Sequence, residues 1–269
     1  MESLKTIPQD KLKHVEIHLV DHCNLNCKFC DHFAPLAKKF FLSVDEFQKD
    51  IERLAYILKS KLEELMLLGG EPLLHPNLIK FFPIARKYFP KTKIILMTNA
   101  ILLKVQTKEF WDALKENSID LTVTKYPIDL NWEELEAIAN TNGIDIIYYK
   151  DKNELKTSYH VPLDLDGKQN CLKSFLGCFH ANNCVLLKQG RLYTCSIIAN
   201  IIHFNEFFHK NLVVSENDSI DIYKVETNEE LCSFLAKPTS FCRYCNVKWR
   251  TFEHPWGLSE KNITEWTIL

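Results

Sequence analysis

The chain has 269 residues, of which 46% are hydrophobic and 25% charged, with a formal net charge of -2. This composition is ordinary for a soluble globular protein and gives one large domain with room for a small second one. The small net charge excludes a strong basic field for a nucleic acid backbone, and no apolar run is long enough to span a membrane. The first residues lack the apolar segment of a secretory signal. We therefore expect a cytoplasmic protein with no nucleic acid and no membrane among its partners.

The first 150 residues alternate between predicted strands and predicted helices. Apolar runs predict strands at 14–20, 65–68, 93–98, 119–126 and 144–149. Helical patterns follow the capping box at 43–46 and cover 77–88, 108–117 and 131 to about 143, and Pro83 requires a kink or a late start in the second of them. Alternating strands and helices form βαβ units, and five clear strands are too few for an eight-stranded barrel. We expect an α/β fold with a partial (β/α)5-6 TIM-like barrel, with a sixth strand near 159–163.

Beyond about residue 150 the alternation stops and cysteines become dense. Seven of the ten cysteines lie after residue 170. A turn at Gln189-Gly190 between two short apolar runs predicts a β-hairpin, and 228–236 predicts a short helix. We therefore expect two domains, a partial barrel over 1–160 and a small β-hairpin/helix domain over 161–269. In a cytoplasmic chain this many cysteines favours metal ligation over disulfides.

Three cysteines share one short loop directly after the first predicted strand. Their spacing is C-x3-C-x2-C, at Cys23, Cys27 and Cys30. A cubane [4Fe-4S] cluster normally takes four thiolates, so three in one loop leave one iron open to another ligand. Zinc is the alternative, with a fourth ligand from His18, His22 or His32, but structural zinc sites usually join two separate cysteine pairs. The spacing therefore favours an iron–sulfur cluster with an open position.

Three further polar motifs follow predicted strands at the same edge of the sheet. They are Gly69-Gly70-Glu71-Pro72 after the second strand, Thr98-Asn99 after the third and Thr124 after the fourth. In a parallel barrel the chemistry gathers at the C-terminal ends of the strands. Glycine lets the backbone approach a ligand and offer its polar groups to an ammonium or a carboxylate. Each motif alone is more often a turn or a cap, but four at one edge indicate a binding site.

The cysteine spacing and the Gly-Gly-Glu-Pro string together resemble the signature of the radical S-adenosylmethionine (radical SAM) superfamily. The resemblance implies a [4Fe-4S] cluster on Cys23, Cys27 and Cys30 whose open iron binds SAM. The implied contacts to SAM come from Phe29, Gly69, Gly70, Glu71, Pro72, Asn99 and Thr124. The implied reaction is reductive cleavage of SAM to a 5'-deoxyadenosyl radical, which takes a hydrogen atom from the substrate. A flavodoxin- or ferredoxin-like electron donor is the implied partner.

The later cysteines resemble a second motif found behind many radical SAM barrels. Their hairpin and C-x2-C pattern is similar to the Twitch domain, the shortened form of the SPASM domain, which holds one auxiliary [4Fe-4S] cluster. The implied ligands of this second cluster are Cys178, Cys195, Cys242 and Cys245. Cys184 competes with Cys178 for the first position, and the same cysteines would permit zinc. Cys171 and Cys232 are expected to be small buried hydrophobes.

In layout the chain resembles the 2-deoxy-scyllo-inosamine dehydrogenases, which oxidise a ring alcohol to a ketone. The resemblance implies an oxidoreductase-like radical SAM enzyme whose small-molecule substrate is a carbohydrate, cyclitol or nucleotide-sugar. The alternative among enzymes is peptide modification by thioether formation, epimerisation or sulfatase maturation. Those relatives often carry a leader-recognition domain before the barrel, and a first strand that begins at residue 14 is expected to leave no room for one. An iron–sulfur electron-transfer or binding module is the alternative outside enzymes. Lys125, His160 and His180 are possible proton acceptors, and no residue is assigned as catalytic.

Three tryptophans distinguish the last twenty residues or so of the chain. They are Trp249, Trp256 and Trp266. Large aromatic side chains in a polar tail indicate packing against the rest of the protein. We expect them to cap the open bottom of the barrel or the auxiliary cluster, with closure over the substrate pocket as the alternative.

Overall fold

The computed structural model describes residues 5–268. Its frame is an eight-stranded sheet in the order β5-β4-β3-β2-β1-β7-β8-β9. The five N-terminal strands are parallel to one another. Their bounds are β1 His14–Val20, β2 Glu64–Gly69, β3 Lys93–Thr98, β4 Ile119–Val123 and β5 Ile146–Tyr148. The predicted α/β class with a partial, mostly parallel barrel is confirmed.

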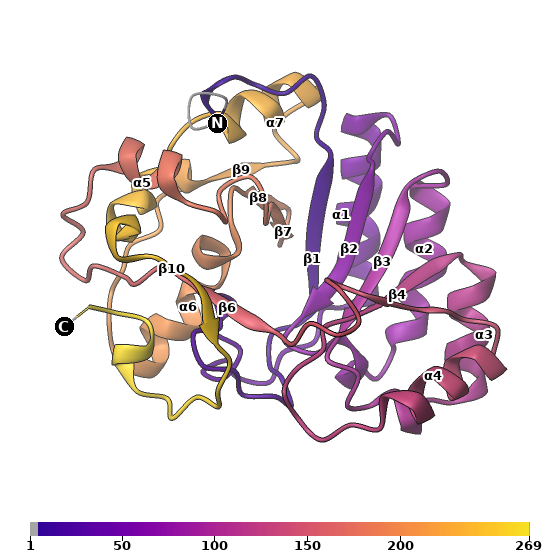
Figure 1. Ribbon diagram of the computed structural model, residues 1–269. Helices are drawn as coiled ribbons and strands as arrows, with labels where there is room; N and C mark the ends of the chain where they lie inside the picture. Colours follow the sequence, from indigo (N-terminus) through magenta and orange to yellow (C-terminus); the bar gives the residue numbers. More distant parts are fainter. Residues whose placement is uncertain (1–4, 269) are drawn as a thin grey trace.

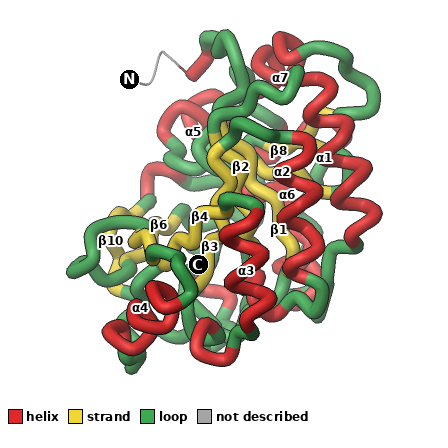
Figure 2. Tube along the Cα trace, turned by 90° about the vertical axis from the view of Figure 1, so that its right-hand side faces the viewer, coloured by secondary structure: helices red, strands yellow, loops and turns green. Residues whose placement is uncertain are grey.

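Four helices cover one face of the parallel strands (Figures 1 and 2). They are α1 Val44–Leu58, α2 Phe81–Tyr88, α3 Lys108–Glu116 and α4 Trp132–Thr141. The α1 helix begins where the Ser43 side chain accepts a hydrogen bond from the Glu46 backbone N–H, and it ends at Lys59, whose φ is 52°. A separate 3-10 turn at Leu78–Lys80 precedes α2, so Pro83 falls in the first turn of α2, where proline is tolerated. The late start is therefore the correct alternative for this helix.

Side chains along β1 alternate between the helical layer and the inside of the partial barrel. The odd-numbered residues pack into the main hydrophobic core with the helices, and they are Val15, Ile17 and Leu19. His14 and Glu16 lie on the other face and line a cavity. The same alternation in β2 and β3 leaves a small apolar patch on the inner face, made of Met66, Leu68, Ile95 and Met97. The inner face is therefore partly polar and partly apolar, as a chamber for a small molecule requires.

The C-terminal part adds strands and helices on the other side of β1 (orange and yellow in Figure 1). Strand β7 (Leu186–Lys188) pairs parallel with β1, and β8 (Arg191–Tyr193) and β9 (Ser219–Asp221) follow antiparallel. The predicted hairpin turn forms at Gln189 and Gly190, whose φ values of 51° and 70° match a tight hairpin connection. The additional helices are α5 Cys171–Gly177, α6 Ser196–Phe208 and α7 Asn228–Leu235. None of the helices in residues 5–268 is long and apolar enough to cross a membrane.

The segment expected as a sixth barrel strand lies elsewhere. Strand β6 (Thr157–His160) pairs with β10 (Thr251–Pro255) in a separate two-stranded sheet, and β7 is the sixth parallel strand of the large sheet. Pro162 follows β6 closely and cannot donate to a ladder, which keeps this strand short.

Candidate active site

The polar motifs of the first four strands meet around one cavity of about 480 Å³. The residues expected to bind SAM or iron that line it are Cys23, Cys27, Phe29, Cys30, Gly69, Gly70, Glu71, Asn99 and Thr124. Pro72 is buried in the 3-10 turn Pro72–Leu74 and is not among the lining residues. A cavity of this volume falls in the range of small-molecule and cofactor sites.

The three loop cysteines are free thiols on the wall of this cavity. Burial raises the pKa of Cys23 to about 12 and also raises the pKa values of Cys27 and Cys30. A buried thiol of this kind ionises only beside a positive centre, and a bound metal supplies that charge and deprotonates its thiol ligands. The donor set therefore suits an iron centre chemically.

The two motif glycines allow strand β2 to approach the cysteine loop closely. A side chain at Gly69 would place its Cβ 2.1 Å from the Val20 carbonyl oxygen, and one at Gly70 would lie 2.1 Å from that of His22. The Gly70 backbone N–H donates to Val20 O at 2.7 Å, and the Gly69 φ of 145° also favours glycine. The glycines therefore position the start of the cysteine loop on the end of β2.

Glu71 and Asn99 brace the ends of β2 and β3. The buried Glu71 carboxylate accepts hydrogen bonds from Thr98 Oγ1 (2.7 Å) and from the backbone N–H groups of Asn99 and Leu73 (both 2.9 Å). Burial raises the pKa of Glu71 to about 7, although these donors oppose the shift. The Asn99 amide donates to Asn24 Oδ1 at 2.7 Å, in the loop that carries the cysteines. Both side chains therefore hold the cavity wall in place from within.

Strand β6 and the C-terminal tail pack against the cysteine loop. The Phe29 ring packs on His160 and His254, with centroid distances of 4.5 and 4.4 Å. The Lys28 backbone N–H donates to Gly257 O at 2.8 Å, and the Trp266 indole donates to Cys30 O at 2.9 Å.

The three tail tryptophans occupy different environments. Trp256 lines the cavity, which matches the alternative expectation of closure over the pocket. Trp266 packs in the same hydrophobic cluster as Cys195 and Cys245, whereas Trp249 is 60% exposed. Of the two expected places, the barrel bottom and the auxiliary cysteines, Trp266 lies beside the second, and the tail follows the β6–β10 pair toward the cysteine loop.

The second set of predicted ligands also comes together. Cys178 follows α5, Cys195 precedes α6, and Cys242 and Cys245 lie in and after the 3-10 turn Ser240–Tyr244. All four are buried. Burial raises the pKa of Cys245, and the nearby thiols of Cys178, Cys242 and Cys195 raise it further. This mutual influence places the four thiols in one neighbourhood.

Two further cysteines lie close to this set. The electrostatic neighbours of Cys184 are first Glu16 and Asp31 and then Cys195 and Cys178. Cys171 is partly exposed and influences Cys242 and Cys245, so the expectation of a fully buried hydrophobe holds for Cys232 and not for Cys171. Within residues 5–268, no three His, Cys, Asp or Glu side chains converge closely enough to hold a single metal ion.

Buried charges fasten the C-terminal hairpin to the end of β1. Lys188 Nζ donates to both carboxylate oxygens of Asp21 at 3.0 Å and to Asn200 Oδ1 at 2.9 Å. Burial acts to raise the pKa of Asp21, but its histidine and lysine partners hold it well below the usual value. This buried ion pair fixes β7 and α6 beside the cysteine loop.

Sequence reasoning missed a polar cluster at the inner end of the cavity. His14 and Glu16 from β1 and Glu64 from β2 all line it. The signal was present in the first strand, where His14, Glu16 and His18 recur at every second position in an otherwise apolar run. Such alternation marks a strand with one polar face, whereas a strand buried on both faces is apolar throughout.

Comparison with known proteins places this arrangement in a class. Residues 17–144, just under half of the chain, match the Radical SAM superfamily. The GTP 3',8-cyclase of Campylobacter lari is 28% identical over 139 residues, which cover 50% of this chain and 42% of that protein. The GTP 3',8-cyclase of Aquifex aeolicus is 33% identical over 134 residues, which cover 48% and 39%. The chain thus spans about two-fifths of the length of these curated relatives.

Residues 17–144 are therefore similar to the radical SAM domain. Beyond that domain, a crystal structure of BtrN in complex with AdoMet and 2-DOIA is similar over 88% of this chain and 94% of its own length. Its TM-score is 0.53 and its sequence identity 16%, so the shared property is the fold.

Proposed function

We propose that this protein is a radical SAM enzyme that removes a hydrogen atom from a small polar substrate. The main support for this proposal is that three free thiols, the glycine motif and the ends of β3 and β4 line one cavity. When bound, the iron–sulfur cluster and SAM would supply the radical: one electron from a flavodoxin- or ferredoxin-like donor would cleave SAM to methionine and a 5'-deoxyadenosyl radical, which would abstract the hydrogen atom.

The chain's own residues hold, orient and shield this chemistry. Cys23, Cys27 and Cys30 would hold the cluster, and Gly69, Gly70, Glu71, Asn99 and Thr124 with Phe29 would surround SAM, with Pro72 setting the turn behind them. Trp256 of the tail lines the cavity wall and would help to keep water out. Exclusion of water and oxygen protects a reactive species from side reactions.

The second set of cysteines would hold an auxiliary [4Fe-4S] cluster in a Twitch-like domain over about 161–269. Cys178, Cys195, Cys242 and Cys245 are the proposed ligands, because each is buried and the thiols influence one another. An auxiliary cluster able to accept an electron would make the net reaction a two-electron oxidation of the substrate. The proposed class is therefore an oxidoreductase acting on a carbohydrate, cyclitol or nucleotide-sugar.

A second candidate substrate is a purine nucleotide. The curated relatives that match residues of the radical SAM domain are named GTP 3',8-cyclase. On this alternative the same radical chemistry would act on a nucleoside triphosphate. The carboxylates of Glu16 and Glu64 in the cavity wall, and the lack of an arginine in its described lining, argue against it.

The decisive experiment reconstitutes the protein anaerobically with iron and sulfide, adds SAM and a reductant, and measures 5'-deoxyadenosine. We expect release by the wild type and none by Cys27→Ala. Cys232→Ala is the matched control, because Cys232 is buried in α7 and none of the groups that influence its pKa is another cysteine. If the wild-type protein binds iron but never cleaves SAM, the enzyme proposal is wrong, and an iron–sulfur electron-transfer or binding module is the explanation that remains.

A further inference from the structure

Two carboxylates flank a histidine at the inner end of the cavity. His14 Nε2 lies 3.3 Å from Glu16 Oε1, and His14 Nδ1 lies 2.9 Å from Glu64 Oε1. All three side chains line the same cavity as the loop cysteines. Their mutual contacts fix their rotamers, so the cluster is a preformed polar feature of the cavity wall.

The cluster and the cysteine loop lie at opposite ends of β1. Glu16 is four residues before Val20, which corresponds to about 13 Å along a strand. The cysteine loop begins directly after β1, so a cofactor held there leaves the Glu16 end of the cavity to a second molecule. The apolar patch of Met66, Leu68, Ile95 and Met97 lies on the same inner face, with Met66 opposite Glu16 in the sheet.

Glu16 has an unused acceptor at this position. The residue is only 6% exposed, and its Oε2 has no hydrogen-bond partner among the described residues. Its other oxygen, Oε1, faces His14 Nε2 at 3.3 Å. A buried carboxylate oxygen without a donor is costly, so it calls for a donor from outside the chain. Glu64 differs, because its Oε2 lies 3.5 Å from Lys93 Nζ.

The charges around the cavity do not suit a triphosphate. Its lining includes the carboxyl groups of Glu16, Asp31, Glu64 and Glu71, and its possible cations include Lys28, Lys156, His14 and His180. Asp31 already pairs with His180, and Glu16 and Glu64 both face His14. No arginine lines it within residues 5–268. Phosphate groups are usually held by bidentate arginines, lysines or a metal ion, and they are repelled by carboxylates. With two carboxylates around one histidine at the Glu16 end and no arginine in the described lining, a neutral or cationic molecule fits that end better than GTP.

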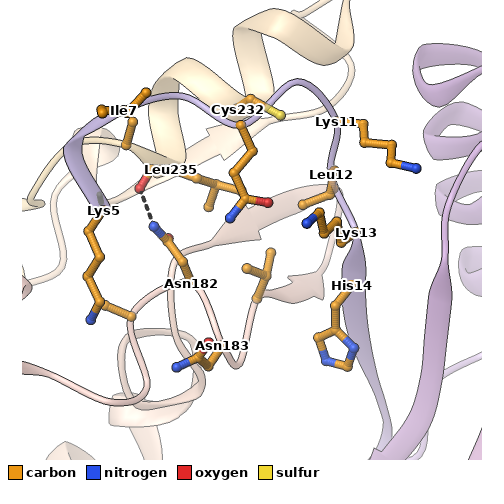
Figure 3. Close-up of a pocket in the computed structure, with 14 residues that line it drawn as sticks. Lys5, Ile7, Lys11, Leu12, Lys13, His14, Asn182, Asn183, Cys232 and Leu235 are labelled. Atoms are coloured by element: carbon orange, nitrogen blue, oxygen red, sulfur yellow. Dashed lines mark hydrogen bonds between the residues drawn. The ribbon is translucent and has the colours of Figure 1, made fainter. Parts of the chain in front are cut away.

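A second cavity of about 340 Å³ reaches the same cluster from the other end of β1 (Figure 3). His14 and Asn183 line both cavities. Two of the lysines around the second cavity already have partners, because Lys11 pairs with Glu63 at 2.7 Å and Lys5 donates to the Phe175 and Cys178 carbonyl oxygens. His14, one member of the polar cluster, therefore borders both cavities.

We infer that Glu16, held by His14 and Glu64, anchors the substrate by accepting a hydrogen bond from a hydroxyl or ammonium group of a small polyol or amino-polyol without phosphate. The inference rests on the proposed function, because it takes the cavity as the substrate chamber. It adds the chemical class of the substrate and the residue that selects it. Glu16 is a binding residue in this scheme and takes no part in bond breaking.

The test is calorimetric binding to the reconstituted full chain with SAM present, without reductant, so that no turnover is needed. The probes are glucosamine, glucose and GTP, which carry an ammonium group, hydroxyls only, and a triphosphate. We expect glucosamine to bind more tightly than glucose and both more tightly than GTP. Glu16→Gln keeps the side-chain shape and removes the charge, and we expect it to weaken glucosamine binding about tenfold.

Glu134→Gln is the matched control, since Glu134 lies on α4 outside the cavity and pairs with Lys104, and we expect wild-type binding. Thermal melts of both variants establish that they fold. If Glu16→Gln does not fold, the order of the three wild-type affinities decides. Tightest binding of GTP, no saturable binding of either sugar, or equal glucosamine affinity in a folded Glu16→Gln would each overturn the anchor. Failure of SAM cleavage would instead count against the proposed function and would leave these affinities interpretable.

Discussion

His180 Nε2 lies 3.1 Å from Asp31 Oδ2, and this contact joins the two cysteine sets. Asp31 directly follows Cys30, and His180 lies two residues after Cys178. Ser196, which follows Cys195, donates its hydroxyl to the same Asp31 oxygen at 3.0 Å. Burial acts to lower the pKa of His180, but Asp31 and the adjoining Cys178 outweigh it and raise the pKa to about 10. The Asp31 carboxylate, beside the first cysteine set, therefore accepts hydrogen bonds from side chains next to Cys178 and Cys195 of the second set.

This junction predicts a stability loss on Asp31→Asn. The substitution keeps the shape but leaves a buried histidine without its negative partner, and we expect the free energy of unfolding to fall by about 1–3 kcal/mol. Anaerobic urea denaturation of the metal-free protein measures it. The control is Asp166→Asn, which breaks an exposed pair with Lys168 and should cost less than about 0.5 kcal/mol. Equal effects of the two variants would show that the junction contributes nothing.

The glycine motif predicts that Gly70→Ala loses the iron that we propose on Cys23, Cys27 and Cys30. The added Cβ would lie 2.1 Å from His22 O and 2.8 Å from Asp21 O, so the start of the cysteine loop must move. We expect about four fewer irons per chain after reconstitution and a free energy of unfolding lower by about 3 kcal/mol. Gly257→Ala is the control, because nothing lies within 4 Å of its added Cβ. Full iron content in Gly70→Ala would mean that the close approach is not needed.

Local patterns in the sequence were enough to predict the first half of the fold. Strands of continuous apolar residues and capping signals such as Ser43 with Glu46 located β1 to β5 and the helices between them. The rim motifs followed from topology, because parallel strands bring their C-terminal ends to one edge. These features depend on residues near in sequence, which is why they were predictable.

The second half depends on contacts between distant residues. Strands β7 to β9 have three residues each, and β7 joins the sheet through its pairing with β1, some 170 residues earlier. Helix α6 is apolar on most sides, with Ile197, Ile198 and Ile201 buried, so it shows no clear helical period. The contacts of the tail with the cysteine loop, such as Trp266 with Cys30, likewise leave no local pattern.

The polar cluster in the barrel predicts a pH-dependent contribution of His14 to stability. Burial acts to lower the pKa of His14, but the carboxylates of Glu16 and Glu64 outweigh it and raise the pKa above 6.5. Lys93, which faces Glu64, is the nearby cation. Because the folded pKa is raised, the stabilisation is fully present below pH 6.5 and is lost as the pH rises through the folded pKa.

His14→Asn should therefore lower the free energy of unfolding most at about pH 6 and least at about pH 9. Urea denaturation of the wild type and the variant across this range gives the difference at each pH. In a Glu16→Gln, Glu64→Gln background the same substitution should show no such slope, since the charges that raise the pKa are gone. A difference that grows with pH would reverse the sign and disprove the assignment.

Cys178 and Cys184 compete for the first position among the proposed ligands of the auxiliary cluster. Cys178 is the strongest thiol influence on both Cys195 and Cys245, whereas the main neighbours of Cys184 are Glu16 and Asp31. We expect about eight irons per wild-type chain, about four in Cys178→Ser and about eight in Cys184→Ser, because each cubane holds four. Iron and sulfide analysis after anaerobic reconstitution measures this. Loss of iron in Cys184→Ser but not in Cys178→Ser would show that Cys184 is the ligand. Four irons and one zinc per wild-type chain would show that the second site holds zinc and no cluster.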